Sequence, residues 1–132
     1  MGYVVKAPPT VGVPVHGSSD LFPVRRIFCV GRNYAAHARE MGHDPDREPP
    51  FFFMKPASTC IVGPGDLVRI PRGCQVFDWE VEVVVVFGRG GRDISQSDAM
   101  SHVAGYSIGI DFTASNGNAK SKMSSHFFGP TN

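Results

Sequence analysis

The sequence has no long hydrophobic run and almost no net charge. None of its apolar segments approaches the ~20 residues needed to cross a bilayer, and prolines at positions 8, 9 and 14 interrupt the N-terminus, unlike a secretory signal. The formal net charge of +1, from 13 basic and 12 acidic residues, provides no basic surface for nucleic acid or for an anionic membrane. We therefore expect a cytoplasmic protein with neither a nucleic-acid partner nor a membrane partner.

Cysteine is also scarce. The three cysteines, Cys29, Cys60 and Cys74, are odd in number, and their spacing matches neither a CxxC motif nor a zinc site. We expect them to be reduced thiols. The glycine-rich segment 88–92 is not followed by a Lys-Ser or Lys-Thr pair, so it is no phosphate-binding loop, and a hairpin turn explains its glycines.

The main feature that is present is the stretch 77–88, FDWEVEVVVVFG. Its β-branched and aromatic residues, ended by glycine, predict a β-strand. One face would carry Trp79 and the odd-numbered valines, and the other would carry Glu80 and Glu82 followed by two valines. Because both faces are mostly apolar, we expect a central strand that is buried on both sides. The two carboxylates either lie in water at the rim of the sheet or bind a cation, and the pattern leaves both open.

Short strands and helices are expected around this strand. At 132 residues the chain has room for one domain, and its class is mainly β with short helices (α+β). Residues 1–20 read as an extended N-terminal arm, and residues 21–132 as the domain itself. The other expected strands are 24–30, 51–55, 67–70 and 106–113, and the expected helices are 34–41 and about 95–103.

His37 and Glu40 lie three residues apart on the helix expected at 34–41, which puts them side by side. A carboxylate beside an imidazole fixes the tautomer of the ring and raises its basicity, and this is how a general base is built. An exposed surface pair has the same spacing, so the spacing alone allows both interpretations.

Asp111 and Lys55 are two further candidates. Asp111 lies late in a mostly apolar strand, where it could complete a site of three carboxylates with Glu80 and Glu82. Such an all-oxygen site suits Mg²⁺ or Mn²⁺ and does not suit zinc. Lys55 follows three phenylalanines and a methionine at the end of a strand. It either binds an anionic substrate or extends its ammonium group into water.

Several segments, taken together, resemble the fumarylacetoacetate hydrolase family. They are 30–42 (VGRNYAAHAREMG), 49–58 (PPFFFMKPAS), 63–71 (GPGDLVRIP), 78–95 (DWEVEVVVVFGRGGRDIS) and 98–114 (DAMSHVAGYSIGIDFTA). The N-terminal segments are most similar to the fumarylpyruvate hydrolase branch. The resemblance implies a mixed β-roll or sandwich that binds Mg²⁺ or Mn²⁺ through Glu80, Glu82 and Asp111.

The same resemblance implies an activity. It is the hydrolysis of a carbon–carbon bond in a 2,4-diketo acid, which converts fumarylpyruvate to fumarate and pyruvate. His37, oriented by Glu40, would activate the water. The residues that would contact the 2-oxo acid substrate are Arg32, Tyr34, Lys55 and Lys120. The alternative within the enzyme class is decarboxylation of oxaloacetate, which uses the same metal-chelated 2-oxo acid.

Two departures from the family pattern shape these expectations. Ser115 and Asn116 stand where the family has an Arg-Asp pair after the metal-binding Asp. The strands that close the family's roll are absent after position 114, so we expect a partial catalytic domain, incomplete at its C-terminus, in a truncated chain. A non-catalytic, truncated homologue is therefore the second hypothesis. Because missing sheet partners leave strand edges unpaired, we also expect a homo-oligomer, such as a dimer.

Overall fold

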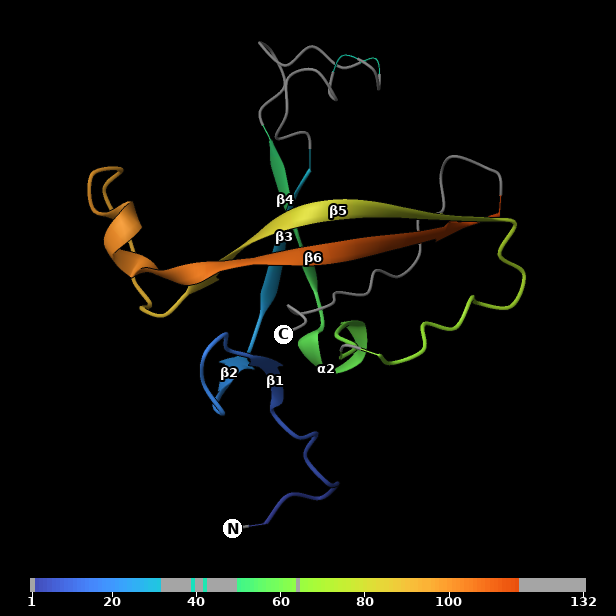
Figure 1. The fold of residues 1–132 in the computed structure, drawn as a ribbon, viewed down its shortest axis with the longest axis horizontal. Coiled ribbons are helices and arrows are strands. Elements are labelled where there is room, and N and C mark those ends of the chain that lie inside the picture. Colours follow the sequence, from blue (N-terminus) through green and yellow to red (C-terminus); the bar gives the residue numbers. More distant parts are fainter. Residues whose placement is uncertain (1, 32–38, 40–41, 43–49, 64, 117–132) are drawn as a thin grey trace. The chain divides into compact units, whose positions relative to one another are not determined.

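The structure, a computed structural model, describes residues 2–31, 39, 42, 50–63 and 65–116. Strands dominate this part and form two-stranded sheets, with a short helix and a 3₁₀ turn (Figure 1). The pairs are β1 (Val11–Pro14) with β2 (Leu21–Val24), β3 (Ile27–Gly31) with β4 (Phe51–Lys55), and β5 (Val76–Phe87) with β6 (Val103–Ser115). The helical segments are α2 (Ala57–Cys60) and η1 (Ala99–His102). The expected class, mainly β with short helices, is confirmed.

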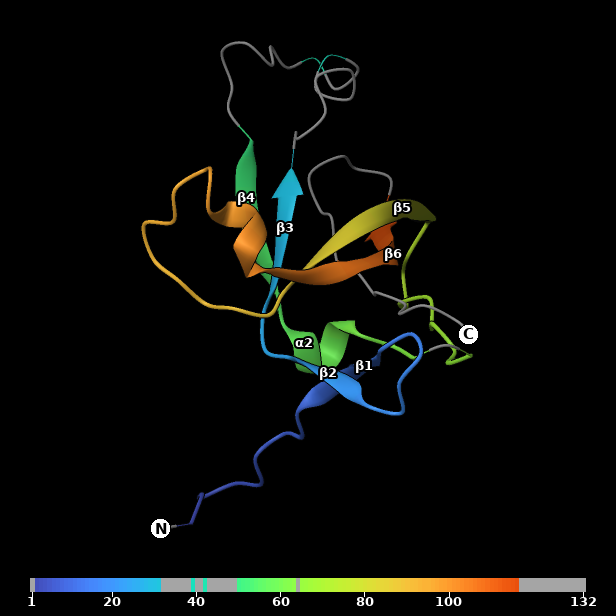
Figure 2. The ribbon, with the colours of Figure 1, turned by 60° about the vertical axis from the view of Figure 1, so that its left-hand side comes forward.

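β5 and β6 form a long antiparallel ribbon, whose twist is visible in Figures 1 and 2. Its register is continuous from Val76 opposite Ser115 to Val86 opposite Gly105, where a bulge shifts the pairing. A strong twist is normal for a two-stranded ribbon. Because side chains alternate between faces, the odd-numbered residues of β5 share a face with the even-numbered residues of β6.

The expectation that 77–88 is a central strand buried on both sides is wrong. In the described part of the chain β5 pairs with β6 alone, and Val81 and Val83 are 62% and 68% exposed. An apolar strand becomes buried only when another layer covers its face, and the sequence alternation does not say which layer that is.

β3 and β4 form a second antiparallel pair, with Ile27 opposite Lys55 and Gly31 opposite Phe51. The strands expected at 24–30 and 51–55 are therefore confirmed, the first with shifted ends. Gly31 lies close under the Phe51 ring, and a Cβ atom there would force that ring to move. The helix expected at 34–41 follows β3 in the chain, and nearly all of it lies outside the described residues.

The N-terminal part contains a hairpin that the sequence pattern did not indicate. Residues 1–20, expected as an extended arm, include β1, which pairs with β2. The amide of Ser18 donates to the Val15 carbonyl at 3.1 Å across the connecting turn. Gly17 has a φ of 73° in this turn, a conformation that glycine adopts without strain.

Two other expected elements are absent or shorter. The strand expected at 67–70 does not form, and Leu67 is 86% exposed. Pro71 lacks an amide donor, and an exposed segment without a partner strand gains little from extension. The helix expected at 95–103 shrinks to η1, because the Ser95 hydroxyl bonds Oδ2 of Asp98 at 2.7 Å and closes a tight turn before it.

Few described side chains are buried. The apolar ones are Ala57, Cys60 and Ala114, and the polar ones are Lys55 and His102. Within the described residues, the three cysteines form no disulfide bond. Within the described residues, no helix has both the length and the apolar character to cross a membrane.

His102 closes the long loop between β5 and β6. Its Nδ1 lies 3.1 Å from the carbonyl oxygen of Arg89, and its own carbonyl accepts from the amide of Gly88 at 3.1 Å. A Cβ atom at Gly91 would lie 2.9 Å from Cε1 of the ring, so the loop passes close to the imidazole. The ring therefore holds together two sides of a loop whose other residues are mostly exposed.

Candidate functional site

Glu80 and Asp111 lie directly opposite each other in the β5–β6 ribbon, and Glu82 lies opposite Gly109. Opposite residues project to the same side of a sheet, as do residues two apart on one strand. The register therefore places these three carboxylates on one face. Cβ atoms of opposite residues are about 5 Å apart and those of diagonal neighbours about 7 Å. Glycine at position 109 adds no side chain between Glu82 and Asp111.

The three carboxylates differ in their exposure to water. Glu80 is exposed, whereas Glu82 and Asp111 are half-buried, and Oδ1 of Asp111 is shielded from solvent. Two like charges 6 Å apart repel by about 0.7 kcal/mol in water and by more where water is displaced. A hard divalent cation with a preference for oxygen, such as Mg²⁺ or Mn²⁺, would offset this repulsion.

In their observed conformations, the three carboxylate side chains do not form a coordination sphere. Among the residues described, no three His, Cys, Asp or Glu side chains gather closely enough to hold a metal ion. Glu80 and Glu82 each have one more torsion angle than Asp111 through which their oxygens can approach it. The oxygen ligands on this face and their places in the register suit a divalent ion. The role of the face as a metal site stays a prediction.

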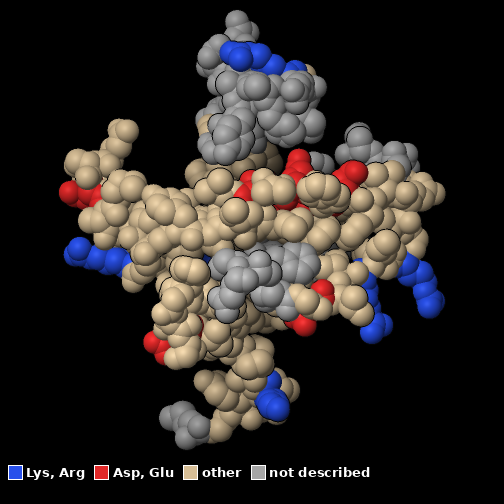
Figure 3. All heavy atoms as spheres, in the orientation of Figure 1, with Lys and Arg blue, Asp and Glu red and all other residues tan. Residues whose placement is uncertain are grey.

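Asp78 is a further carboxylate on this face that the sequence analysis did not assign. It lies opposite Thr113 and two residues before Glu80, so Asp78, Glu80 and Glu82 form a continuous series on one side of β5. The spacing of i, i+2 and i+4 was the signal that could have identified it. Figure 3 shows acidic side chains along the β5–β6 ribbon in this view.

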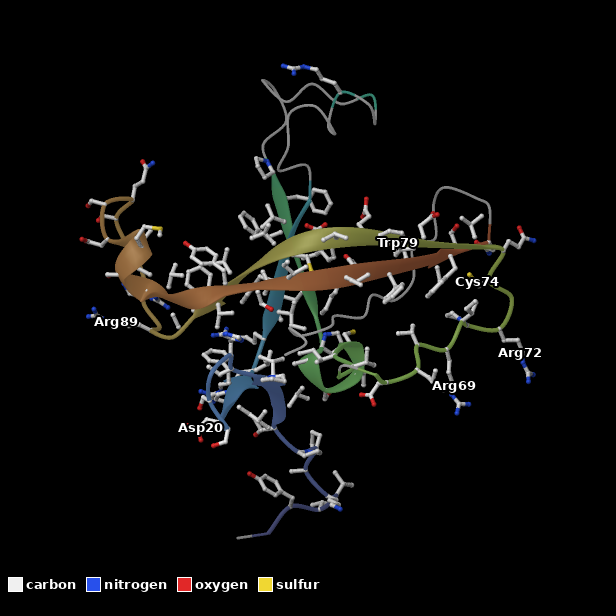
Figure 4. The ribbon with its side chains drawn as sticks, viewed as in Figure 1. Asp20, Arg69, Arg72, Cys74, Trp79 and Arg89 are labelled. Carbon is white, nitrogen blue, oxygen red and sulfur yellow. The ribbon has the colours of Figure 1, made fainter. Side chains whose placement is uncertain are left out.

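The opposite face of the same ribbon is apolar. Trp79, labelled on β5 in Figure 4, lies opposite Phe112. The rings of Phe77 and Phe112 stack with centroids 5.2 Å apart and planes within 8°. Acidic and apolar side chains are thus sorted onto opposite faces of the ribbon.

Lys55 ends β4 and does not extend into water. Only 7% of the residue is exposed, and its Nζ lies 5.5 Å from the centroid of the Phe53 ring. Phe53 in turn stacks on Phe51 at 5.8 Å, so the ammonium group ends a row of aromatic rings on one face of β4. The alternative of a solvent-exposed lysine is therefore wrong. A desolvated ammonium group beside an aromatic ring can attract an anion more strongly than one in water.

The remaining predicted site residues lie outside the described part of the chain. They are His37 and Glu40 of the proposed base, and Arg32, Tyr34 and Lys120 of the proposed substrate site. Their roles stay predictions.

The sequence was compared with known families and curated proteins. Residues 26–130 match the family described as "Fumarylacetoacetate (FAA) hydrolase C-terminal". The mitochondrial oxaloacetate tautomerase FAHD1 of Arabidopsis thaliana is 40% identical over 99 residues, which cover 75% of this chain and 44% of that protein. The mitochondrial oxaloacetate decarboxylase of Dictyostelium discoideum is 42% identical over 90 residues, covering 68% and 41%. The chain therefore spans less than half the length of these relatives.

The comparison with solved structures leads to the same family. The fumarylpyruvate hydrolase of Pseudomonas aeruginosa, solved in complex with Mn²⁺ and pyruvate, is 47% identical and superposes with a TM-score of 0.75. The match covers 85% of this chain and 49% of that one. A putative fumarylpyruvate hydrolase of Burkholderia cenocepacia is 43% identical with a TM-score of 0.63, covering 86% and 45%. The fold of this chain is thus that of part of a fumarylacetoacetate hydrolase-type domain.

Proposed function

Because the chain belongs to the fumarylacetoacetate hydrolase family, we propose that it serves the metal-dependent hydrolysis of a carbon–carbon bond in a 2,4-diketo acid, with fumarylpyruvate as substrate. The observation that carries this proposal is the register that sets Glu80 opposite Asp111, with Glu82 on the same face. A similar chain, the fumarylpyruvate hydrolase of P. aeruginosa, was solved with Mn²⁺ and pyruvate, which supports both the metal and the 2-oxo acid.

In this proposal Glu80, Glu82 and Asp111 hold a divalent ion, Mg²⁺ or Mn²⁺. When bound, the ion would supply a Lewis acid for the 2-oxo acid end of the substrate. His37, oriented by Glu40, takes a proton from water while the water oxygen bonds to the carbonyl carbon distal to the 2-oxo acid.

The bond between that carbon and the neighbouring methylene carbon then breaks. Its electron pair stays on the methylene carbon, which leaves as the enolate of pyruvate and is protonated to pyruvate. The other product is fumarate. The role of the chain's cations is to compensate the charge of the substrate's carboxylates and of the leaving enolate.

Lys55 is the described cation best suited to that role. Only 7% of the Lys55 residue is exposed, so pairing it with a carboxylate costs less further desolvation than pairing an exposed lysine. Arg32, Tyr34 and Lys120 are assigned to the same substrate by family resemblance.

The second candidate function is tautomerisation or decarboxylation of oxaloacetate. The names of the A. thaliana and D. discoideum relatives favour it, and oxaloacetate carries the same 2-oxo acid group. The third is a non-catalytic homologue that keeps the metal ligands, which the sequence analysis also allows.

A single set of assays separates the three. The chain is incubated with Mn²⁺ and either fumarylpyruvate or oxaloacetate, and pyruvate, fumarate, carbon dioxide and the keto–enol ratio are measured. Our proposal expects equal amounts of pyruvate and fumarate, lost in Glu82→Gln and kept in Asp20→Asn, a control at an exposed carboxylate in the β1–β2 turn (Figure 4). Turnover of oxaloacetate alone supports the second function, and metal binding without turnover of either substrate supports the third.

A further inference from the structure

Two adjacent arginines, Arg25 and Arg26, lie in the short link between β2 and β3. Both are exposed, and together they line a cavity of about 360 Å³. This volume lies within the range of small-molecule sites, which runs from roughly 300 to 1,000 Å³. The proposed function uses neither arginine, so the cavity needs a separate explanation.

The chain around this cavity provides no anion to compensate the two guanidinium groups. The segment 21–39, which includes both arginines and β3, contains no Asp or Glu, and neither does the segment 49–65, which includes β4. Within the part of the chain that the structure describes, neither arginine forms an ion pair. Two positive charges that the chain does not neutralise attract an anion, and the attraction increases where the walls of a cavity displace water.

An aromatic ring restricts the position of Arg26. Its Cζ atom lies 5.6 Å from the centroid of the Phe28 ring. Phe28 is itself fixed by the pairing of β3 with β4, in which it lies opposite Met54. A cation–π contact limits the positions of the guanidinium group, so less conformational freedom is lost when that group binds a ligand.

We propose that Arg25 and Arg26 bind the phosphate group of a small phosphorylated molecule. At pH 7 a phosphate monoester carries about −1.5 to −2 charges and three strong acceptor oxygens on one group. A guanidinium group binds phosphate through two parallel hydrogen bonds, so two guanidinium groups can bind a single phosphate. A phosphate ion is much smaller than this cavity, which therefore also has room for the organic part of the ligand.

Carboxylates are the competing class of anion, and they belong to the substrate of the proposed function. A dicarboxylate divides its charge between two separate groups, whereas a phosphate concentrates it on one, which suits two arginines that are adjacent in the chain. Lys55, which we assign to a substrate carboxylate, lies opposite Ile27 and shares its face of the β3–β4 pair. Phe28, which contacts Arg26, projects to the other face. The phosphate site is therefore distinct from the proposed substrate contact.

The first experiment needs no variant. The full chain is freed of divalent ions by a chelator and dialysed, and binding of inorganic phosphate, glycerol 3-phosphate and succinate is measured by calorimetry. Both phosphate compounds should bind with a Kd of about 1 mM or lower, and succinate should bind at least tenfold more weakly. Because no metal is present, this outcome is independent of the proposed activity.

The second experiment assigns the binding to the two arginines. Arg25→Gln and Arg26→Gln should each weaken the binding of glycerol 3-phosphate about tenfold, because each removes a charge-assisted hydrogen bond. Arg26→Lys should lose less than Arg26→Gln, since it keeps the charge without the two parallel hydrogen bonds. The matched control is Arg69→Gln, at an exposed arginine before β5 (Figure 4). It should bind like the parent chain, and equal Tm values check that every variant is folded.

Three results would overturn the proposal. No binding of either phosphate compound at millimolar concentration would show that the cavity holds no phosphate. Succinate that binds as tightly as glycerol 3-phosphate would make this a general anion site. An affinity for glycerol 3-phosphate that is unchanged in both glutamine variants would place the phosphate elsewhere on the chain.

Discussion

Glu80 of β5 pairs directly with Asp111 of β6, whereas Trp79, one residue earlier, pairs with Phe112. Because neighbouring residues of a strand project to opposite faces, this single step separates a carboxylate face from an apolar face. The separation depends on register, since a slip of one residue in β6 would bring Asp111 to the side of Trp79. The bulge in this ribbon lies beyond Val86, so the register around the carboxylates is uninterrupted.

The first prediction is that a divalent ion stabilises the fold through the carboxylate face. Mn²⁺ at 100 times its dissociation constant should add about 2.7 kcal/mol to the free energy of unfolding, and raise Tm by several degrees. Glu82→Gln should remove the shift, because it takes away one anionic ligand, while Asp20→Asn should keep it. The measurement is Tm by calorimetry with and without millimolar Mn²⁺, and an unchanged Tm of the parent chain would refute the metal site.

The second prediction concerns His102 and the loop that it closes. His102→Ala removes a buried ring and leaves the Arg89 carbonyl without its partner, which should lower the free energy of unfolding by about 1–3 kcal/mol. His102→Asn should lose less, because its amide can still donate to that carbonyl. The measurement is urea unfolding, with Met100→Ala as the control.

Met100 lies in the same 3₁₀ turn and is 66% exposed, so its truncation should change stability by less than about 0.5 kcal/mol. Equal stability of His102→Ala and the parent chain would show that the ring does not hold the loop.

The sequence predicted the two strands of the long ribbon. Valine-rich alternation identified β5, and the later apolar run identified β6, because β-branched and aromatic residues fit a pleated strand. Glu80 and Glu82 are two residues apart, so the alternation of side chains along a strand placed both on one face. The pairing of Glu80 with Asp111 could not be predicted in this way. It follows from the antiparallel register, which depends on a loop whose length the sequence pattern does not fix.

Features that depend on distant contacts were not predictable in the same way. The burial of Lys55 and the exposure of Val83 both contradict what composition suggests. Whether a side chain is covered depends on the layer packed against it, and a single strand does not encode that layer. The β1–β2 hairpin was missed because Pro14 and Pro23 interrupt the alternation that reveals strands.

The third prediction is that Lys55 binds the anionic end of a 2-oxo acid. Lys55→Met keeps a flexible side chain of similar length on the Phe53 ring but removes the charge. Affinity for oxalate, measured by calorimetry in the presence of Mn²⁺, should fall about tenfold or more, as expected for loss of a charge-assisted hydrogen bond.

The control for this variant is Lys6→Met, which removes an equal charge from an exposed position near the N-terminus. It should leave oxalate affinity unchanged. Equal affinities in Lys55→Met and in the parent chain would assign Lys55 a packing role only.

The last prediction concerns His37 and Glu40, which we assign as the base and its orienting partner. His37→Ala should lower kcat for fumarylpyruvate by about two to four decades, which is what general-base catalysis contributes. Oxalate binding should barely change, since the metal held by the carboxylates would bind that ligand. Glu40→Gln should lower kcat less, because the imidazole remains but loses the carboxylate that orients it. The control is His16→Ala, at an exposed histidine in the β1–β2 turn. If His37→Ala hydrolyses fumarylpyruvate at the parent rate, the pair is an exposed ion pair worth a few tenths of a kcal/mol, and the base lies elsewhere.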